Sequence, residues 1–170
     1  LFNGILICDF WGAYNKINAL AKQRCFYHLF TELVKVDAHN RSVAWKAFRK
    51  KLSRLLKDAV RLSEKKNQVA FFGSKKDCIA DLNSFWQHPV RDKDAQRLTK
   101  RLNRHKQELF TFLEHEGVSP YNNHAEQQMR KPVLTRKVSQ QNRSAQGANT
   151  QAILMTLLRS AELQGANPVE

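Results

Sequence analysis

The chain lacks both a long apolar stretch and the start of a secretory signal. No apolar run in its 170 residues approaches the roughly eighteen that a transmembrane helix needs. The first residues carry neither the basic start nor the small-residue cleavage site of a signal peptide. We therefore expect a soluble, cytoplasmic protein with no membrane partner.

Cysteine is also scarce: Cys8, Cys25 and Cys78 are an odd number at spacings that fit no disulfide framework. Such a set suits a reducing compartment. Cys25 and His28 have the spacing of half a zinc site, but no matching second pair follows them. We therefore expect no closed structural zinc site. In its place we expect a buried cysteine beside a histidine that hydrogen-bonds at a helix start.

Acidic residues are few, since 15 aspartates and glutamates face 29 lysines and arginines and the formal net charge is +14. This excess predicts an anionic partner, with nucleic acid as the default. It is densest between Asn40 and Asn67, where ten basic residues accompany two acids. One interpretation is contact with DNA phosphates, and the other is a solvated helix face. The residues predicted to contact DNA are Arg41, Lys46, Arg49, Lys50, Arg54, Lys57 and Arg61, followed by Lys131, Arg136 and Lys137.

Hydrophobic spacing predicts a mostly helical chain with one or two strands. Gly4 to Cys8 is a continuous apolar run typical of a buried parallel strand, and Gln23 to Cys25 predicts a second, brief strand. A helix is expected between these strands, as far as about Leu20. Further helices are expected over residues 26–36, 42–67 and 93–115, from Ser74 onward, and over residues 148–163. No repeat or low-complexity tract is present.

Asp9 follows the first predicted strand directly. Ligands and metal ions gather at the carboxyl ends of strands in open α/β sheets, which makes Asp9 a candidate site residue. Its alternative role is to cap the helix that we expect after it.

A second candidate carboxylate lies in the segment from Tyr121 to Lys137. Asn122 or Asn123 can cap a helix there, and Pro132 predicts that the helix ends near Lys131, with an extended segment after it. Glu126 and Arg130 are four residues apart and would share one face. Asn123 and Glu126 also match a capping box, in which the glutamate only closes the helix start.

Two local patterns resemble transposases of insertion-sequence family sixty-six, which belong to the DDE group. Gly4, Leu6, Asp9, Tyr14 and Asn15 resemble the block that carries the family's second catalytic aspartate. The string Asn122-Asn123-His124-Ala125-Glu126, followed by Arg130, Pro132 and the pair Arg136-Lys137, resembles the block that carries its last catalytic glutamate. The C-terminal Gly-Ala-Asn-Pro is also similar, so that the resemblance covers about half of the chain.

This resemblance implies a ribonuclease-H-like fold that cuts and joins DNA with two Mg²⁺ (or Mn²⁺) ions. Asp9 and Glu126 would be catalytic metal ligands, with Cys25, His28, Asn123 and Arg130 near the site. Residues 1–28 would be part of the ribonuclease-H-like core, residues 29–118 a helical insertion, and residues 119–170 the return to the core. The full-length protein would be a homo-oligomer associated with the bacterial nucleoid.

The chain departs from the family pattern because no candidate for the first catalytic aspartate precedes Asp9. We therefore expect the C-terminal part of a catalytic domain with a truncated α/β core, inactive alone. The alternatives are a non-catalytic basic helical module that binds nucleic acid, such as a decayed transposase remnant, and a helical protein-interaction domain.

Overall fold

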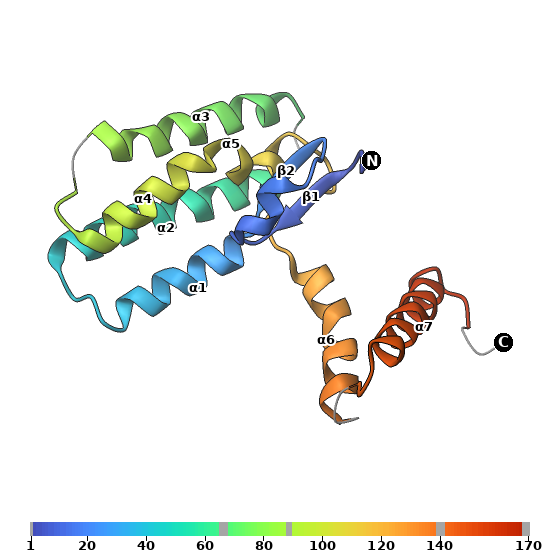
Figure 1. Ribbon diagram of the computed structural model, residues 1–170. Helices are drawn as coiled ribbons and strands as arrows, with labels where there is room; N and C mark the ends of the chain where they lie inside the picture. Colours follow the sequence, from blue (N-terminus) through green and yellow to red (C-terminus); the bar gives the residue numbers. More distant parts are fainter. Residues whose placement is uncertain (1, 65–67, 88–89, 139–141, 168–170) are drawn as a thin grey trace. The chain divides into compact units, whose positions relative to one another are not determined.

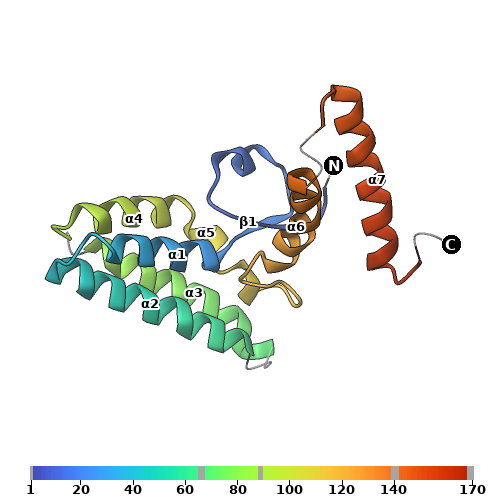
Figure 2. The same cartoon turned by 90° about the horizontal axis from the view of Figure 1, so that it is seen from below.

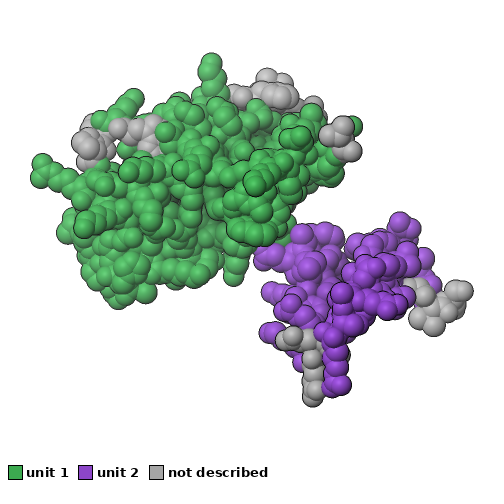
Figure 3. All heavy atoms as spheres, viewed as in Figure 1, with its two compact units in different colours: residues 1–122 green, residues 123–170 purple. Residues whose placement is uncertain are grey.

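The computed structural model describes residues 2–64, 68–87, 90–138 and 142–167. The chain divides into two compact units, residues 1–122 and residues 123–170 (Figure 3). The described residues form seven α-helices, two short 3₁₀ helices and one two-stranded sheet. The expected mostly helical fold with a small parallel sheet is confirmed, while a ribonuclease-H-like core stays a prediction.

The sheet consists of β1 (Ile5–Cys8) and β2 (Ala21–Arg24), which run parallel with Ile5 opposite Ala21 and Cys8 opposite Arg24. Both predicted strands are thus confirmed to within two residues. The helix expected between them is wrong, since the structure has only the short 3₁₀ helix η1 (Gly12–Lys16). The connection must turn back within about a dozen residues to pair in parallel, and its glycine and asparagines are poor helix formers.

The rest of residues 1–122 forms a helical bundle beside the sheet (Figures 1 and 2). Helix α1 (Phe26–Asp37) follows β2 directly, α2 (Val43–Glu64) is the longest helix, and α3 (Gln68–Gln87) lies against α2. The three corresponding predictions are confirmed in type. However, α3 begins before Ser74 and includes Gly73, because one glycine costs a helix only about 1 kcal/mol. The predicted end of α2 at Asn67 lies outside the described residues.

The helix expected over residues 93–115 is broken into α4 (Lys93–Arg104), α5 (Lys106–Leu109) and η2 (Thr111–Leu113). The breaks fall at His105 and Phe110, which have non-helical backbone angles. Both side chains are buried, so tertiary packing outweighs the local helical pattern here. The core of the unit contains Phe26, Leu29, Leu33, Trp45, Leu52, Leu56, Leu82, Leu98, Leu102 and Phe112.

Residues 123–170 contain α6 (Asn123–Val138) and α7 (Ala145–Leu163), and neither helix has a buried residue. The predicted end of α6 at Lys131 and the extended segment after it are wrong, since the helix continues through Pro132 to Val138. Proline removes one hydrogen bond at a cost of about 3 kcal/mol, which weakens a helix without having to end it. The Arg159 guanidinium on α7 donates to Gln128 Oε1 on α6, and Lys131 pairs with Glu162 at 3.4 Å. These contacts stabilise the helical pair.

Across the described residues, no helix combines the length and the apolar composition that a bilayer crossing requires.

Candidate functional site

Asp9 lies immediately after β1, at the carboxyl end of the parallel sheet. Its Oδ1 accepts a hydrogen bond from the Trp11 backbone N–H at 2.7 Å, which orients the carboxylate. Its backbone carbonyl accepts a hydrogen bond from Arg24 Nη1 at 2.8 Å. The strand end that presents the carboxylate is therefore held through both the side chain and the main chain.

Arg24 is fully buried although it carries a charge. Its Nε donates to Glu108 Oε2 at 2.5 Å, and its Nη2 donates to Asn15 Oδ1 at 2.6 Å. Glu108 Oε2 also lies 3.0 Å from His105 Nδ1. A buried charge is tolerated only when it is paired and hydrogen-bonded, and Arg24 meets this condition through groups on three segments of the unit.

The titration of this network follows from burial and from the Arg24 charge. Burial alone would raise the pKa of Glu108, but the hydrogen bond and charge of Arg24, together with His105, outweigh it and hold the pKa of Glu108 below its ordinary value. Burial is the largest cause that lowers the pKa of His105. At neutral pH we therefore describe the network as a guanidinium and a carboxylate with a neutral imidazole beside them.

Gln23, the neighbour of Arg24 on β2, is also fully buried. Its Nε2 donates to the carbonyl of Leu109 at 2.9 Å, and its Oε1 accepts from the Phe112 N–H at 3.0 Å. Sequence reasoning missed both Gln23 and Arg24, because a polar strand such as Ala-Lys-Gln-Arg carries no local sign that its last two side chains are buried.

A cleft of about 550 Å³ opens beside Asp9, and we call it the Asp9 cleft. Three segments line it. They are the loop after β1 (Asp9 and Trp11), α1 (His28, Glu32 and Lys35) and α4 (Arg97 and Arg101). Glu32 forms ion pairs with Arg97, at 2.6 Å, and with Arg101. The structure thus brings His28 to the same cleft as Asp9, as part of a surface with both signs of charge.

Cys25 lies close to His28, since its Sγ and a ring nitrogen of His28 are within 4.8 Å of each other. It is fully buried at the start of α1, and its Sγ accepts a hydrogen bond from the Asn122 backbone N–H at 3.2 Å. Cys25 is absent from the lining of the Asp9 cleft. In residues 1–122 this hydrogen bond joins the start of α1 to the end of the unit.

The remaining candidates lie on α6 and are described within residues 123–170. Asn123 is the first residue of α6, Glu126 is partly buried in its first turn, and Arg130 is exposed one turn later. The expected helical presentation of Glu126 is confirmed. The cations Lys131, Arg136 and Lys137 are all exposed on the same helix.

The exposed face of α2 carries most of the other predicted DNA contacts. Lys46, Lys50 and Lys57 are exposed at helical spacing, and we call them the α2 lysine row. They help to line a shallow hollow of about 500 Å³ on this face. Within the described parts of the chain, no ion pair neutralises these three lysines.

The predicted arginines of the same region are more constrained. Arg49 Nε contacts Asp37 at 2.5 Å, and Asp58 pairs with both Arg54 and Arg61, at 3.6 Å and 3.1 Å. Arg41 is exposed just before α2. The lysine row is therefore the part of α2 that is best placed to meet an external anion.

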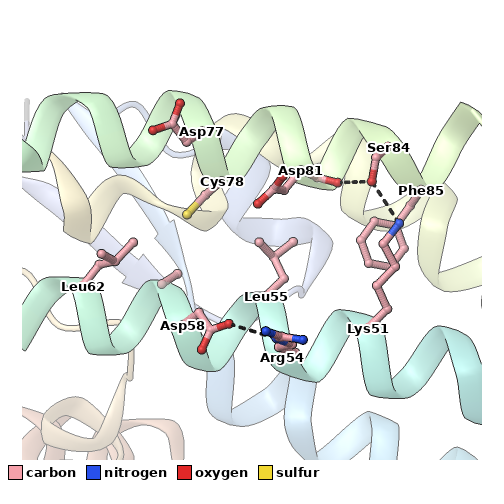
Figure 4. Close-up of a pocket in the computed structure, with 11 residues that line it drawn as sticks. Lys51, Arg54, Leu55, Asp58, Leu62, Asp77, Cys78, Asp81, Ser84 and Phe85 are labelled. Atoms are coloured by element: carbon pink, nitrogen blue, oxygen red, sulfur yellow. Dashed lines mark hydrogen bonds and ion pairs between the residues drawn. The ribbon is translucent and has the colours of Figure 1, made fainter.

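A hollow between α2 and α3 holds several ionisable groups but no activated one (Figure 4). Lys51 donates to Ser84 Oγ at 3.0 Å and lies over the Phe85 ring, while Cys78 points from α3 toward α2. Burial, followed by the charges of Asp81 and Asp77, raises the pKa of Cys78 to about 11. A thiol with this pKa is protonated at neutral pH, so this hollow fits packing better than nucleophilic chemistry.

Divalent cations of the Mg²⁺ type prefer carboxylate oxygens to thiols or imidazoles. The Asp9 carboxylate fits this preference, because a single N–H bond from Trp11 uses only part of its acceptor capacity. Asp9 in residues 1–122 and Glu126 in residues 123–170 are each suitable as one ligand of such an ion.

Comparison with known proteins gives a family. Residues 1–150 match the model of the transposase IS66 family, a match that includes both carboxylates and the α2 lysine row. No curated protein and no solved structure matches the chain. Because the family model covers most of the 170 residues, the chain belongs to the transposase IS66 family.

Proposed function

We propose that the chain is the C-terminal part of a DDE transposase catalytic domain, which cuts and joins DNA strands during transposition. Asp9 and Glu126 act as two of its catalytic carboxylates. The observation that carries the proposal is the position of Asp9 at the carboxyl end of a parallel strand, inside a family match that also includes Glu126. Carboxyl ends of parallel strands are the usual place for such ligands.

The chemistry proposed for these residues is metal-ion catalysis. Two Mg²⁺ or Mn²⁺ ions, when bound, stabilise the attacking and leaving oxygens of a phosphoryl transfer. Asp9 and Glu126 would hold the ions through their carboxylate oxygens, and the Trp11 N–H keeps the Asp9 carboxylate oriented. His28, Cys25, Asn123 and Arg130 complete the proposed surroundings of the site.

The proposed domain plan places residues 1–28 and 119–170 in a ribonuclease-H-like core and residues 29–118 in a helical insertion. The full-length transposase acts as a homo-oligomer at the nucleoid. Asp9 and Glu126 are two of the three catalytic carboxylates of such a domain, and we expect two carboxylates alone to be too few for DNA cleavage.

The metal proposal is tested by adding Mn²⁺ to the ¹⁵N-labelled chain. Bound Mn²⁺ broadens amide signals near its ligands, so the signals of residues 9–12 should broaden first and should stay sharp in Asp9→Asn. The matched control is Asp81→Asn, an aspartate of the α2–α3 hollow, which should leave the broadening unchanged. Equal broadening in wild type and Asp9→Asn would exclude Asp9 as a ligand. In a complete element, Asp9→Asn and Glu126→Gln should each abolish transposition.

We also propose that the α2 lysine row contacts DNA phosphates without reading sequence. Counterion release predicts that each phosphate contact contributes about 0.9 to the slope of log K against log[salt]. Changing Lys46, Lys50 and Lys57 together to glutamine should therefore reduce the slope for duplex DNA by up to about 2.7.

The control variant has the same net charge as the lysine-row variant. It changes three other exposed lysines to glutamine, namely Lys76 on α3 and Lys93 and Lys100 on α4. This control should keep most of the wild-type slope. If both triple variants lose the same slope, the net charge and not the row binds DNA, which is the behaviour of a non-specific basic helical module.

A further inference from the structure

Trp11 has an unusual environment for a tryptophan. Its side chain is 66% exposed, whereas Trp45 in the core is fully buried. Its ring contact with Tyr14 is edge-to-face, with centroids 5.7 Å apart, so that the two rings do not stack on one another. An indole exposed in this way offers a flat apolar face on which another ring can stack.

The position of Trp11 is fixed relative to Asp9. Its backbone N–H donates to Asp9 Oδ1 at 2.7 Å, and both residues line the Asp9 cleft. The backbone before η1 is extended at Trp11, where the 3₁₀ helix begins. The Trp11 backbone, from which the indole projects, is therefore tied to the Asp9 carboxylate by this hydrogen bond.

The cleft that Trp11 lines also contains cations. Lys35 is exposed on α1, and the Arg97 side chain is 54% exposed on α4. Arg97 and Arg101 share the acidic partner Glu32, and Arg97 also lies 3.7 Å from Asp94, whereas no ion pair within the described residues neutralises Lys35. An aromatic ring next to cations is the combination that binds single-stranded nucleic acid, because bases stack on the ring and the cations meet the phosphates.

We propose that the Asp9 cleft binds an unpaired nucleotide at the end of a DNA strand, with its base stacked on the indole of Trp11. The backbone phosphate beside this base meets Lys35 and Arg97. This inference rests on the proposed function for its choice of DNA, and it adds a binding role for a residue that the family resemblance did not single out. Stacking of this kind accepts any base, since every base has a π-face.

The distinction between paired and unpaired DNA separates this site from the α2 lysine row. The lysine row meets phosphates and should bind duplex and single strands alike. Stacking on the Trp11 ring requires a base that is free to leave its own stack. Removal of the Trp11 ring should therefore weaken binding only to DNA that contains such a base.

The test uses oligonucleotides with 2-aminopurine at one end, either single-stranded or within a blunt duplex, without divalent metal. Wild-type protein should quench the single-stranded probe by stacking. Trp11→Ala should bind the single strand about 5- to 150-fold more weakly and lose the quenching, while duplex affinity changes less than about twofold. Trp11→Phe should retain part of both effects. None of these side-chain changes removes the Trp11 N–H that orients Asp9.

The matched control is Tyr27→Ala, because Tyr27 is 53% exposed on α1 and does not line the cleft. The proposal is overturned if Trp11→Ala weakens duplex and single strand equally, or if it has no more effect than Tyr27→Ala. Either result would mean that no base stacks on Trp11. Because metal is absent, a failure of Asp9 as a metal ligand is measured separately and does not affect this result.

Discussion

The two compact units differ in how they hold their candidate carboxylate. In residues 1–122 the strand end at Asp9 is joined to a buried core through the fully buried Arg24. In residues 123–170, Glu126 lies on a helix without a buried residue, and Ile153, Leu154 and Leu157 of α7 are each more than half exposed. Within the described chain, the buried hydrophobic core lies in the first unit.

This difference concerns how each candidate carboxylate is held in position. The backbone of Asp9 is held by Arg24 of β2, and Arg24 is paired with Glu108 of α5, which lies 99 residues later in the chain than Asp9. The surface of α6 and α7 has room for partners, which in the proposed function are DNA and other parts of the transposase. Tryptophan fluorescence reports on the first unit alone, because Trp11, Trp45 and Trp86 all lie in residues 1–122.

The largest effect is expected for Arg24→Met. Removal of the guanidinium leaves the Glu108 carboxylate without its main partner in a partly buried site, which should cost about 3–5 kcal/mol of unfolding free energy. The measurement is urea unfolding followed by tryptophan fluorescence. Arg159→Met, which removes an arginine that contacts Gln128 and Glu162 in the second unit, should leave this transition unchanged.

A double variant separates charge from packing in the Arg24 network. Arg24→Met combined with Glu108→Met removes both charges, and it should regain part of the stability that Arg24→Met loses. If the double variant loses the sum of the two single losses, the arginine stabilises the unit through its packed volume and not through its pairing with Glu108.

A smaller effect is expected for leucine truncations in the two units. Leu52 is fully buried in the core, so Leu52→Ala should lower the free energy of unfolding by about 3 kcal/mol. Leu154→Ala changes a side chain that is 53% exposed on α7 and should cost less than about 0.5 kcal/mol. A large loss for Leu154→Ala, measured by circular dichroism, would show that the α7 surface is buried in solution.

Local patterns predicted the elements but not the contacts that position the site. The apolar run before Asp9 and the polar start before Glu126 predicted a strand end and a helix start, and both are confirmed. Burial of Gln23 and Arg24 could not be predicted, because it depends on Glu108, Leu109 and Phe112, more than 80 residues away in the chain. The helix through Pro132 was missed because a local penalty was given more weight than the contacts between α6 and α7.

The candidate site shows the same limit. The roles of Asp9 and Glu126 were inferred from the family resemblance; the family match confirms the family, and the two roles stay predictions. Trp11 carries no pattern that separates an exposed aromatic residue from a buried one, since exposure depends on how the loop folds beside β1. Exposed lysines on α2 were predicted more readily because a helix with one apolar face must present the other face to water.

The smallest effect is the pH dependence of the first unit near neutral pH. The folded pKa of His105 lies below its ordinary value near 6.5 because of burial, so the unfolded chain binds a proton first as the pH falls. Stability is therefore complete above about pH 6.5 and decreases below it, by at most about 1.4 kcal/mol per pH unit for one proton. The depressed pKa of Glu108 acts in the same direction at lower pH, because its stabilising charge is lost on protonation.

Urea unfolding between pH 7.5 and 5.5 measures this slope. His105→Gln removes the titrating group and should flatten the profile, whereas His124→Gln, which changes an exposed histidine on α6, should reproduce the wild-type profile. We expect this difference because burial disfavours the protonated imidazole, and His105 is buried whereas His124 is exposed. An unchanged slope in His105→Gln would assign the titration to another group and would remove His105 from the network that holds Arg24 and Asp9.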